Sequence, residues 1–409
     1  MNLVFADAAL QTNLGHNATS CRHLVNGARH RNIPAAVLAY SMVDAALQSE
    51  LQAHPWFRCH TYATYDQDPL CGWLGDFDFV AQITHEDLSR LHGVGREDVI
   101  FFNTAGPGQF MGLLRWVQSM PIEQRPTVIV EFGLYAGMHP KEGVHGMELT
   151  HQGDPRPVLL RYTVRKQLTR EDDSWLKLTT FDAQSSAIYE KLLDFPVHTL
   201  PLANPAITSR RSRSGKRPIT VAFLGHQRVS KGYALVPELV RQLLSLQADV
   251  NILVHNGDPG SCSEQQQALH LLAATDSRLI LDERTADPQL WSQLLERADL
   301  VICPYWRDVF VSTYSAVASE AIANAIPLVV PSRTTLANLV HQFGSCGIVY
   351  DDPSDFSNVE TILQAIITAL YHFDTLAVRA QSAAQAWDVQ FGPARLLDTI
   401  LSWHGERSR

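Results

Sequence analysis

The sequence has no apolar run that approaches the roughly 18 residues of a membrane-spanning helix. It also lacks a positive excess, with 33 Lys and Arg against 42 Asp and Glu residues, which argues against a general nucleic-acid-binding protein. Its six cysteines include no CxxC pair, so neither a disulfide scaffold nor a zinc ribbon fits. No apolar leader precedes the strand-like run Leu3–Ala6, and we therefore expect a cytoplasmic protein.

The 409 residues do contain an alternation of short β-branched runs and helix-length segments. This alternation is typical of β-α-β units, and the length suffices for two or three domains. We therefore predict an α/β fold of two Rossmann-like, doubly wound domains that face a cleft. The predicted parts are a first domain at residues 1–207, a basic linker at 208–217, a second domain at 218–385, and a C-terminal helix at 386–409 that returns toward the first domain.

Three segments carry more specific expectations. Residues 77–83 are apolar and are predicted to form a strand, whereas residues 133–175, rich in Gly, His, Pro and charge, are predicted to lie outside the core. The basic run from Arg210 to Arg217 has two interpretations, a solvated linker or a contact with an anionic membrane surface or lipid phosphate. The second interpretation would place the protein at the inner face of the membrane.

A loop with two cations follows the first strand-like run of the second half. In the sequence FLGHQRVSKG (residues 223–232), Gly225 allows a tight turn, and Arg228 and Lys231 stand three positions apart. Arginine can hold a phosphate through two parallel N–H bonds and lysine acts as a point charge, so the pair suits a diphosphate. The spacing matches neither the P-loop nor the dinucleotide fingerprint, and a solvated loop with two surface cations is the alternative.

A helix that carries a carboxylate lies between two further apolar strands. Strand-like residues 300–304 and 328–331 enclose a short helix that begins near Ser315 and contains Glu320. Such a helix places its free N-terminal amides and its carboxylate at the carboxyl edge of a parallel sheet, where α/β folds bind phosphates. An ordinary crossover helix is the alternative.

Together, the G-x-x-R-x-x-K-G loop and the segment around Glu320 resemble the donor-binding region of retaining GT-B glycosyltransferases of the family 4-like group (group 1). The resemblance covers about residues 219–350 well and residues 1–205 only in general layout. It implies that Arg228 and Lys231 hold the diphosphate of a nucleotide sugar and that Glu320 binds the ribose hydroxyls. These three are the catalytic residues that the resemblance implies.

The resemblance also extends the donor site to neighbouring positions. It implies that Gly225 belongs to the phosphate loop and that the backbone at Tyr314, Ser315 and Ala316 meets the β-phosphate. Ser312 stands where the family motif has its first glutamate. This departure puts the contacts to the donor sugar, and activity itself, in question.

On the acceptor side, the resemblance points to Gly15, His16 and Glu131. Gly15 and His16 occupy the place of a Gly-rich loop, with a simple turn as the alternative. Glu131 stands where the family tends to have an active-site histidine. It either hydrogen-bonds an acceptor hydroxyl or caps a neighbouring loop.

The resemblance implies transfer of a hexose, with retention, from a nucleotide-diphosphate sugar to a hydroxyl of a glycan or lipid-linked acceptor in polysaccharide biosynthesis. It implies no metal, no cofactor beyond the donor and no nucleic-acid partner. Two alternatives stay open: a catalytically silent GT-B binding or scaffold protein, and a nucleotide-sugar epimerase or phosphorylase. The acidic triplets at 66–68 and 76–78 raise a further alternative, a Mn²⁺-dependent GT-A enzyme.

Overall fold

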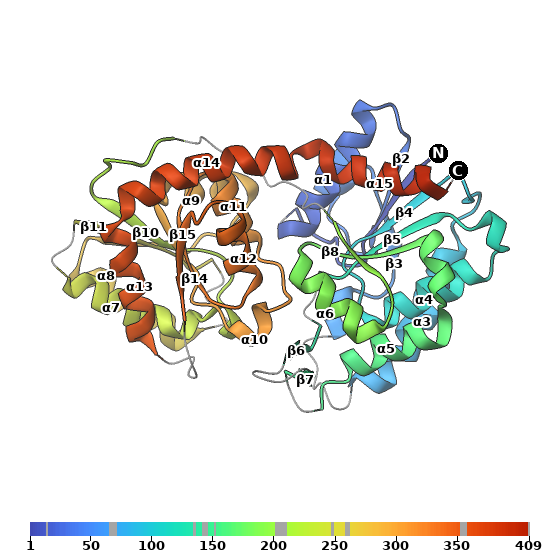
Figure 1. The fold of residues 1–409 in the computed structure, drawn as a ribbon, viewed down its shortest axis with the longest axis horizontal. Helices are drawn as coiled ribbons and strands as arrows, with labels where there is room; N and C mark the ends of the chain where they lie inside the picture. Colours follow the sequence, from blue (N-terminus) through green and yellow to red (C-terminus); the bar gives the residue numbers. More distant parts are fainter. Residues whose placement is uncertain are drawn as a thin grey trace. The chain divides into compact units, whose positions relative to one another are not determined.

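The computed structural model describes residues 1–13, 15–64, 72–133, 136–140, 146–150, 153–200, 211–246, 249–257, 262–351 and 358–407. The chain forms two compact units (Figure 1). Unit 1 comprises Met1–Asn204, Val311–Tyr314 and Phe391–Arg409, and unit 2 comprises Pro205–Phe310 and Ser315–Gln390. Val311–Tyr314 therefore belongs to unit 1 although its chain neighbours on both sides belong to unit 2.

Unit 1 contains, among the described residues, a seven-stranded parallel sheet in the order β3-β2-β1-β4-β5-β8-β9. An antiparallel pair, β6 and β7, follows β5 in the chain. The strands are β1 (Leu3–Ala6), β2 (Ala35–Tyr40), β3 (Ala53–Phe57), β4 (Val99–Phe102), β5 (Thr127–Glu131), β6 (Met138–Pro140), β7 (Met147–Leu149), β8 (Leu176–Thr180) and β9 (Val197–Thr199). The helices are α1 (Gly15–His30), α2 (Ala45–Leu51), α3 (Gly72–Ser89), α4 (Pro107–Gln118), α5 (Arg156–Gln167), α6 (Ala183–Leu193) and α15 (Pro393–Arg407), with 3-10 turns η1 (Thr61–Thr64), η2 (Ile122–Gln124) and η3 (Arg170–Ser174).

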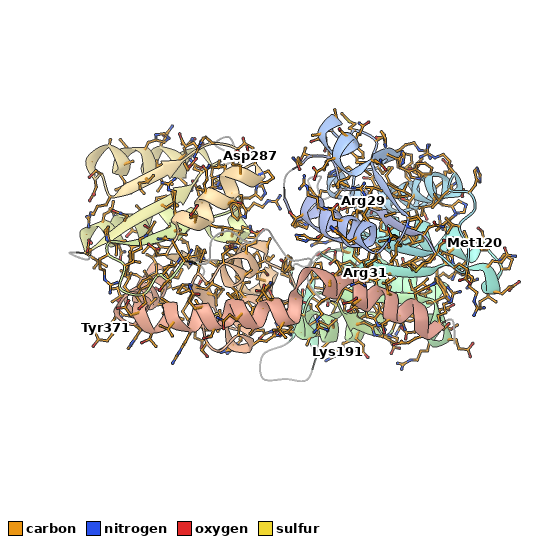
Figure 2. All side chains as sticks on the ribbon, turned by 90° about the horizontal axis from the view of Figure 1, so that it is seen from above. Arg29, Arg31, Met120, Lys191, Asp287 and Tyr371 are labelled. Atoms are coloured by element: carbon orange, nitrogen blue, oxygen red, sulfur yellow. The ribbon has the colours of Figure 1, made fainter. Side chains whose placement is uncertain are left out.

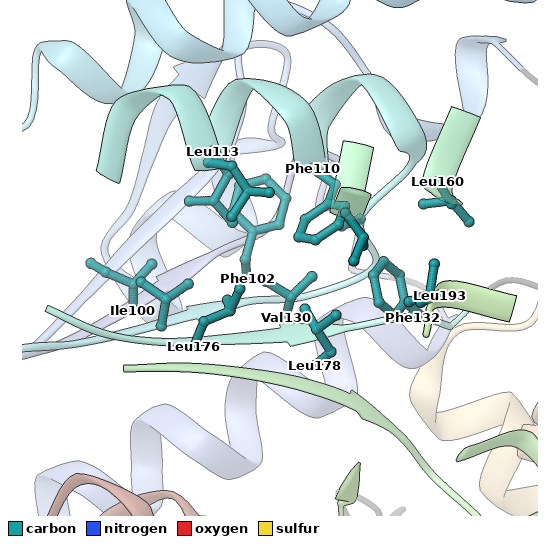
Figure 3. Close-up of a cluster of buried hydrophobic side chains, with 14 of the residues drawn as sticks. Ile100, Phe102, Phe110, Leu113, Val130, Phe132, Leu160, Leu176, Leu178 and Leu193 are labelled. Atoms are coloured by element: carbon teal, nitrogen blue, oxygen red, sulfur yellow. The ribbon is translucent and has the colours of Figure 1, made fainter. Parts of the chain in front are cut away.

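Both faces of this sheet are buried, and successive residues of a strand serve opposite faces. Val99 and Phe101 of β4 belong to the core shared with α1, α2 and α15. Ile100 and Phe102 belong to the core shared with α4, α5 and α6 (Figure 3). A parallel sheet covered on two sides requires apolar runs of this kind, without alternating polar positions.

Unit 2 is built on a second parallel sheet. It has six strands in the part of the chain that the structure describes, in the order β12-β11-β10-β13-β14-β15. The strands are β10 (Ile219–Phe223), β11 (Val250–His255), β12 (Leu279–Asp282), β13 (Leu300–Ile302), β14 (Leu328–Pro331) and β15 (Gly347–Tyr350). The helices are α7 (Val236–Ser245), α8 (Ser263–Thr275), α9 (Pro288–Arg297), α10 (Arg307–Phe310), α11 (Ala316–Ala323), α12 (Thr335–Gln342), α13 (Val359–Tyr371) and α14 (Phe373–Phe391), with 3-10 turns η4 (Val229–Lys231) and η5 (Tyr233–Leu235).

The prediction of two doubly wound α/β domains is confirmed, but residues 77–83 are wrongly predicted as a strand. They lie within helix α3, which packs closely on α4. A Cβ atom on Gly112 of α4 would lie 2.4 Å from the carbonyl oxygen of Ala81, so glycine permits this approach. A short apolar run does not distinguish a buried helix from a buried strand, and here the tertiary contact decides.

Residues 133–175 are also closer to the core than predicted. Helix α5 begins at Arg156, and its residues Leu160 and Val164 are buried in the main core of unit 1. Strand β3 lies at the edge of the sheet and was missed, because it contains Pro55, a residue that edge strands tolerate and central strands do not.

Part of the basic run is paired within unit 2 at the positions that the structure describes, and its contact with a membrane stays a prediction. Arg210 lies outside the described residues. Arg211 and Lys216 form ion pairs with buried Asp299 at 2.7 and 2.5 Å. Arg213 is itself buried and donates from Nε to the carbonyl oxygen of Ala298. These contacts tie the start of unit 2 to the residue that precedes β13.

The C-terminal helix α15 packs on α1 within unit 1. Leu396, Leu397 and Ile400 are buried beside α1, and Arg31 at the end of α1 pairs with Asp398 at 2.5 Å (Figure 2).

No single helix in the described ranges is long and apolar enough to cross a membrane. Only α13 taken together with the bent stretch Phe373–Arg407 has the length and composition of a membrane span.

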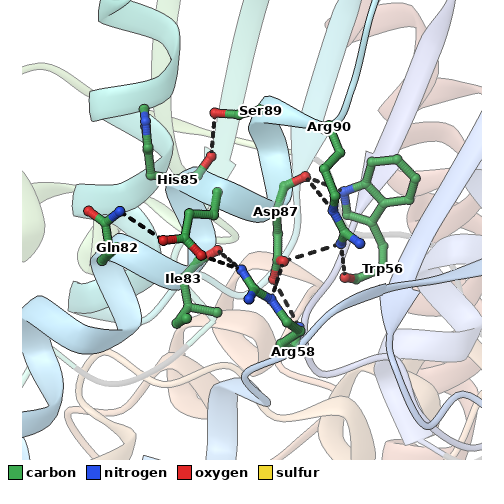
Figure 4. A network of polar contacts seen from close by, with 9 residues as sticks. Trp56, Arg58, Gln82, Ile83, His85, Asp87, Ser89 and Arg90 are labelled. Atoms are coloured by element: carbon green, nitrogen blue, oxygen red, sulfur yellow. Dashed lines mark hydrogen bonds and ion pairs between the residues drawn. The ribbon is translucent and has the colours of Figure 1, made fainter.

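A polar network ties α3 to β3 (Figure 4). Asp87 of α3 is buried and accepts hydrogen bonds from the backbone N–H of Arg58 at 2.9 Å and from its Nε at 2.6 Å. Its backbone carbonyl accepts the indole N–H of Trp56 at 2.9 Å. Arg90 lies over the Trp56 ring at 4.7 Å and also pairs with Asp87.

We expect Asp87→Ala to lower the free energy of unfolding by about 1–3 kcal/mol, because it leaves buried donors without an acceptor. Arg58 and Arg90 are about half exposed, so solvent screens most of the charge interaction between these arginines and Asp87. Glu86→Ala is the matched control, since Glu86 pairs with the same Arg58 at the exposed surface. Urea unfolding of both variants checks the prediction, and equal effects would contradict it.

Candidate functional site

The loop after β10 lies at the point of unit 2 where the strand order reverses, between β10 and β13. Doubly wound sheets bind ligands at this point, beside the carboxyl ends of the strands. Two glycines shape the loop: φ is +105° at Gly225 and +67° at Gly232, values that residues with side chains rarely adopt. A Cβ atom on Gly232 would lie 1.8 Å from the carbonyl oxygen of Pro304, so the loop passes directly against the residues after β13.

Lys231 reaches back across this loop. Its Nζ lies 5.4 Å from the centre of the Tyr305 ring and 3.1 Å from the position that a Cβ atom of Gly225 would take. Its ammonium group makes no hydrogen bond or ion pair with another described residue. Burial lowers the pKa of Lys231 to about 8, while the charges of Cys303 and Glu320 oppose this shift. The ammonium group is therefore available to an anion that enters the loop.

Helix α11 brings a second source of positive potential to the same place. Ser315 caps the helix, because its hydroxyl accepts the N–H of Ala318 at 3.3 Å. The Cγ2 atom of Val317 lies 3.1 Å from the Cβ position of Gly225. The N–H groups of the first turn, which include that of Ala316, therefore lie beside the glycine loop and can bind an anion.

Glu320 follows one turn later on α11. The indole Nε1 of Trp291 donates to its Oε2 at 2.6 Å. Burial raises the pKa of Glu320 to about 7, while the hydrogen bond from Trp291 and the charge of Lys231 lower it. The carboxyl group and the ammonium group thus influence each other and belong to one site.

Tyr305 also belongs to this site, and the sequence analysis did not select it. The residue is 4% exposed, and its Oη lies 3.9 Å from the Cβ position of Gly225. The side chains of Ser315 and Cys303 are the nearest polar groups to Oη, which makes no hydrogen bond of good geometry with them. Burial raises the pKa of Tyr305 well above its ordinary value, so the group is a neutral hydroxyl that can donate to a ligand. The only signal in the sequence is a tyrosine placed just after an apolar strand.

Of the remaining predicted donor residues, Arg228 belongs to unit 2, whereas Ser312 and Tyr314 belong to unit 1. Arg228 is exposed at the start of η4, close enough for its charge to lower the pKa of Lys231. Ser312 belongs to unit 1, where its hydroxyl accepts the N–H of Ala136 at 3.1 Å. The ring of Tyr314, also in unit 1, lies 4.9 Å from the ring of Phe181, at an interplanar angle of 56°. The donor roles of these three residues stay predictions.

The strand order of unit 1 reverses between β1 and β4, and a buried acid follows β1. The Oδ2 atom of Asp7 accepts hydrogen bonds from the amides of Asn17 at 2.8 Å and Asn103 at 2.7 Å. Its Oδ1 accepts the N–H of Ala9 at 2.7 Å. Burial raises the pKa of Asp7 to about 6, and these donors oppose the rise. The sequence analysis missed this network, whose signal is a polar residue directly after each apolar strand.

Glu131 ends β5, the strand beside β4. It is 1% exposed, and neither its Oε1 nor Oγ1 of Thr104 makes a hydrogen bond of good geometry. Burial raises the pKa of Glu131 to about 8, the nearby amide and hydroxyl of Thr104 oppose this rise, and the charge of Asp7 adds to it. Thr104 has φ of +55°, a strained value for a β-branched residue.

The other two residues predicted on the acceptor side are exposed at the start of α1. Gly15 is the first residue of the helix, with φ of +79°. The Nε2 atom of His16 lies 3.4 Å from Oη of Tyr62. Their role in binding an acceptor stays a prediction.

The acidic triplets do not form a metal site in the described ranges. The triplet at 66–68 lies outside them. Asp76 and Asp78 lie on helix α3, and Asp78 pairs with Arg115 at 3.1 Å. Among the described residues no group of three His, Cys, Asp or Glu side chains is placed to hold a metal ion.

Comparison with solved structures identifies the fold. Sucrose-phosphate synthase from Thermosynechococcus elongatus matches with a TM-score of 0.64 at 10% identity, over 100% of this chain and 98% of that one. HepE of Anabaena in complex with UDP matches with a TM-score of 0.62 at 15% identity, over 98% and 99% of the two chains. A glycosyltransferase from Rickettsia africae matches with a TM-score of 0.63 at 9% identity, over 100% and 99%. At these identities the likeness establishes the GT-B fold alone.

No curated protein sequence matches the chain. A family model does match, over residues 184–399, which is more than half of the sequence and includes the glycine loop, Lys231 and Glu320. The model describes family 4 glycosyltransferases in conflict systems. With the GT-B fold, this match shows that the chain is a glycosyltransferase and belongs to the family 4 glycosyltransferases in conflict systems.

Proposed function

We propose that the protein transfers a sugar from a nucleotide-diphosphate sugar to a hydroxyl group of a glycan or lipid-linked acceptor, with retention of the anomeric configuration. The observation that carries the proposal is the convergence of Lys231, Tyr305 and the N-terminus of α11 on Gly225. A cation, a hydroxyl donor and free helix amides around one glycine make a site suited to a diphosphate. HepE of Anabaena, which shares the fold, has been solved with UDP and with UDP-glucose.

In this proposal the main barrier is the negative charge that develops on the leaving diphosphate. Lys231 and the first-turn amides of α11 stabilise this charge, and Arg228 adds to it from the surface. Glu320 holds the ribose through its hydroxyls, since a carboxylate accepts two vicinal O–H groups. The leaving phosphate takes the proton of the acceptor hydroxyl, so no separate base is needed. Because the chain supplies the positive charge, we propose that neither a metal ion nor a cofactor beyond the donor is required.

The proposal is tested with UDP-, GDP- and ADP-glucose and the full-length protein. Calorimetry measures which nucleotide binds, and NMR of the products measures whether a sugar reaches an added glycoside acceptor and in which anomeric configuration. Transfer with retention supports the proposal. Binding without any turnover would instead support a catalytically silent binding protein, and interconversion of donors without an acceptor would support an epimerase. Binding of none of the nucleotides would overturn the donor site.

Donor affinity is expected to peak between about pH 7 and pH 8. The diphosphate binds the charged form of Lys231, so affinity falls as the pH rises through the pKa of about 8 in the free protein. The ribose binds the ionised form of Glu320, so affinity also falls as the pH drops below about 7. Because the two groups interact, the two limbs report the pair rather than either residue alone.

Calorimetry across the pH range measures this profile, with Lys231→Ala and Glu320→Gln as the informative variants. We expect the first variant to lose the alkaline limb and the second to lose the acidic limb. A profile that keeps both limbs in both variants would show that other groups titrate.

A further inference from the structure

Trp291 of helix α9 contacts the candidate donor site, although no motif in the sequence indicates this residue. Its indole Nε1 donates a hydrogen bond to Oε2 of Glu320 at 2.6 Å. The indole ring also meets the ring of His255, the last residue of β11, with 6.2 Å between the centroids and an interplanar angle of 66°. Contacts with α11 and β11 therefore hold the indole beside the carboxyl group.

The carboxylate of Glu320 depends on this contact for its orientation. Among the described residues no other side chain donates a hydrogen bond to it, and Lys231 acts on it only through its charge. A carboxylate offers about four lone-pair sites, and the indole N–H, which donates and cannot accept, uses one of them. The sites on Oε1 and the second site on Oε2 can accept hydrogen bonds from a ligand with adjacent hydroxyl groups.

We propose that Trp291 is the positioning residue of the ribose site and holds the carboxylate of Glu320 in the orientation that accepts the vicinal hydroxyls of a ribonucleoside diphosphate. This inference rests on the proposed function, because it takes Glu320 as the residue that binds the ribose. The alternative is that Trp291 only packs α9 against α11. Removal of the indole N–H distinguishes the two roles, because only positioning makes the effect depend on the ribose hydroxyls.

The same hydrogen bond keeps more of Glu320 ionised. Burial raises the pKa of Glu320 to about 7, while the hydrogen bond from Trp291 and the charge of Lys231 lower it. An ionised carboxylate can accept a hydrogen bond from each of two hydroxyls, whereas a protonated one uses one oxygen to carry its own proton. Loss of the indole N–H therefore raises the pKa of Glu320, and the acidic limb of donor affinity moves to higher pH.

Three further titratable groups lie around this pair: Tyr305, Cys303 and His255. Burial raises the pKa of Tyr305 and of Cys303 and lowers the pKa of His255. All three groups are therefore mostly uncharged near pH 7. A shift of the acidic limb in a variant of Trp291 then reports the ionisation of Glu320.

Trp291→Phe is the informative variant, because it keeps an aromatic ring against His255 and removes the N–H. Trp56→Phe is the matched control. Trp56 is also a half-buried tryptophan whose indole N–H donates one hydrogen bond, at 2.9 Å to the carbonyl oxygen of Asp87, but it lies in unit 1. Thermal unfolding measures the stability of both variants.

Calorimetry with the full-length protein tests the positioning role. UDP, GDP and ADP are compared first, and the tightest binder is then compared with its 2′,3′-dideoxy analogue. We expect the wild type and Trp56→Phe to prefer the ribonucleotide by about tenfold or more, as expected for hydrogen bonds to a charged group. Trp291→Phe should bind the ribonucleotide about two- to tenfold more weakly and the dideoxynucleotide as the wild type does. Equal losses for both nucleotides would overturn the positioning role.

The ¹H–¹⁵N spectrum of the indole groups tests the contact without a ligand. The signal that is missing in Trp291→Phe belongs to Trp291, and in the wild type it should shift with pH near 7, where its acceptor titrates. This titration should disappear in Glu320→Gln, whose side-chain oxygen accepts the N–H but does not titrate. An unchanged titration would point to His255 and overturn the contact. If Trp291→Phe does not fold, the indole signal that loses its titration in Glu320→Gln carries the test.

The nucleotide results separate this inference from the proposed function. If the wild type binds none of the three nucleotides, the proposed function fails, and the ribose role of Trp291 fails with it. If the wild type binds a ribonucleotide and Trp291→Phe binds it equally well, with the same preference over the dideoxynucleotide, only the role of Trp291 fails.

Discussion

Lys231→Ala is expected to lower kcat/KM for the nucleotide sugar by about 10²- to 10³-fold, the range found when one preorganised charge-stabilising group is removed. The ammonium lies against Gly225 and the Tyr305 ring, and among the described residues it has no ion-pair partner. Its charge is therefore available to the leaving diphosphate. Because the group is partly buried, it acts in a medium that screens charge less than water does.

Steady-state kinetics with the preferred nucleotide sugar measures this effect, and calorimetry with the free nucleotide measures how much of it is binding. Lys191→Ala is the matched control, since Lys191 is exposed near the end of α6 in unit 1 (Figure 2). We expect the control to match the wild type. If kcat/KM of Lys231→Ala lies within about twofold of the wild-type value, Lys231 does not stabilise the leaving diphosphate. Arg228 and the α11 amides would then supply that stabilisation.

Gly232→Ala is expected to destabilise unit 2 by about 2–5 kcal/mol and to abolish nucleotide binding. Strain from a side chain in the left-handed region contributes about 1–3 kcal/mol, and overpacking contributes a similar amount. The overlap arises because the new Cβ atom would lie 1.8 Å from the carbonyl oxygen of Pro304. The loop has to move away from the end of β13, and Lys231, the preceding residue, moves with it.

Gly344→Ala separates the two contributions. Gly344 also lies in unit 2 and has φ of +76°, but a Cβ atom there meets nothing within 4 Å. It should therefore show the backbone strain alone, with nucleotide binding intact. Thermal unfolding and calorimetry measure both quantities. An equal loss of stability in the two variants would mean that the Pro304 carbonyl moves aside at little cost.

The departure at Ser312 has a partial explanation in the structure. The family motif places a glutamate at this position, but here the hydroxyl accepts the N–H of Ala136 and the neighbouring Val311 lies in the core of unit 1. Gln184 also donates to the carbonyl oxygen of Val311 at 2.6 Å. The segment Val311–Tyr314 is thus fixed to unit 1 by packing and hydrogen bonds. The buried hydroxyl of Ser312 accepts the N–H of Ala136, whereas a glutamate in its place would have to bury a charged carboxylate, which costs desolvation free energy.

Much of the fold follows from local pattern. The bounds of β1 and β14 agree with the sequence-based strands residue for residue, because each is a short apolar run between polar or glycine-containing turns. The prediction fails at residues 77–83, where an equally apolar run forms part of α3. Gly108 and Gly112 on α4 allow that helix to pack closely, and no pattern within residues 77–83 reports their presence.

Some residues of the candidate site were predicted from the sequence, and others are revealed only by the structure. The glycine loop, Lys231 and Glu320 were found from the sequence because each stands at a fixed offset from a strand end or helix start, and those offsets determine where a residue lies on a parallel sheet. Tyr305 could not be found in this way, because it meets Gly225 across 80 residues of chain.

The sequence by itself determined the fold class and the residues whose type and spacing carry phosphate chemistry, since those depend on local backbone geometry and on charge. Only the tertiary structure decided which polar groups are buried, which pKa values are shifted, and that Arg211 and Lys216 of the basic run pair with Asp299. The physical reason is that burial and pairing depend on elements brought together from distant parts of the chain. A residue's own neighbours in sequence do not reveal what will surround it.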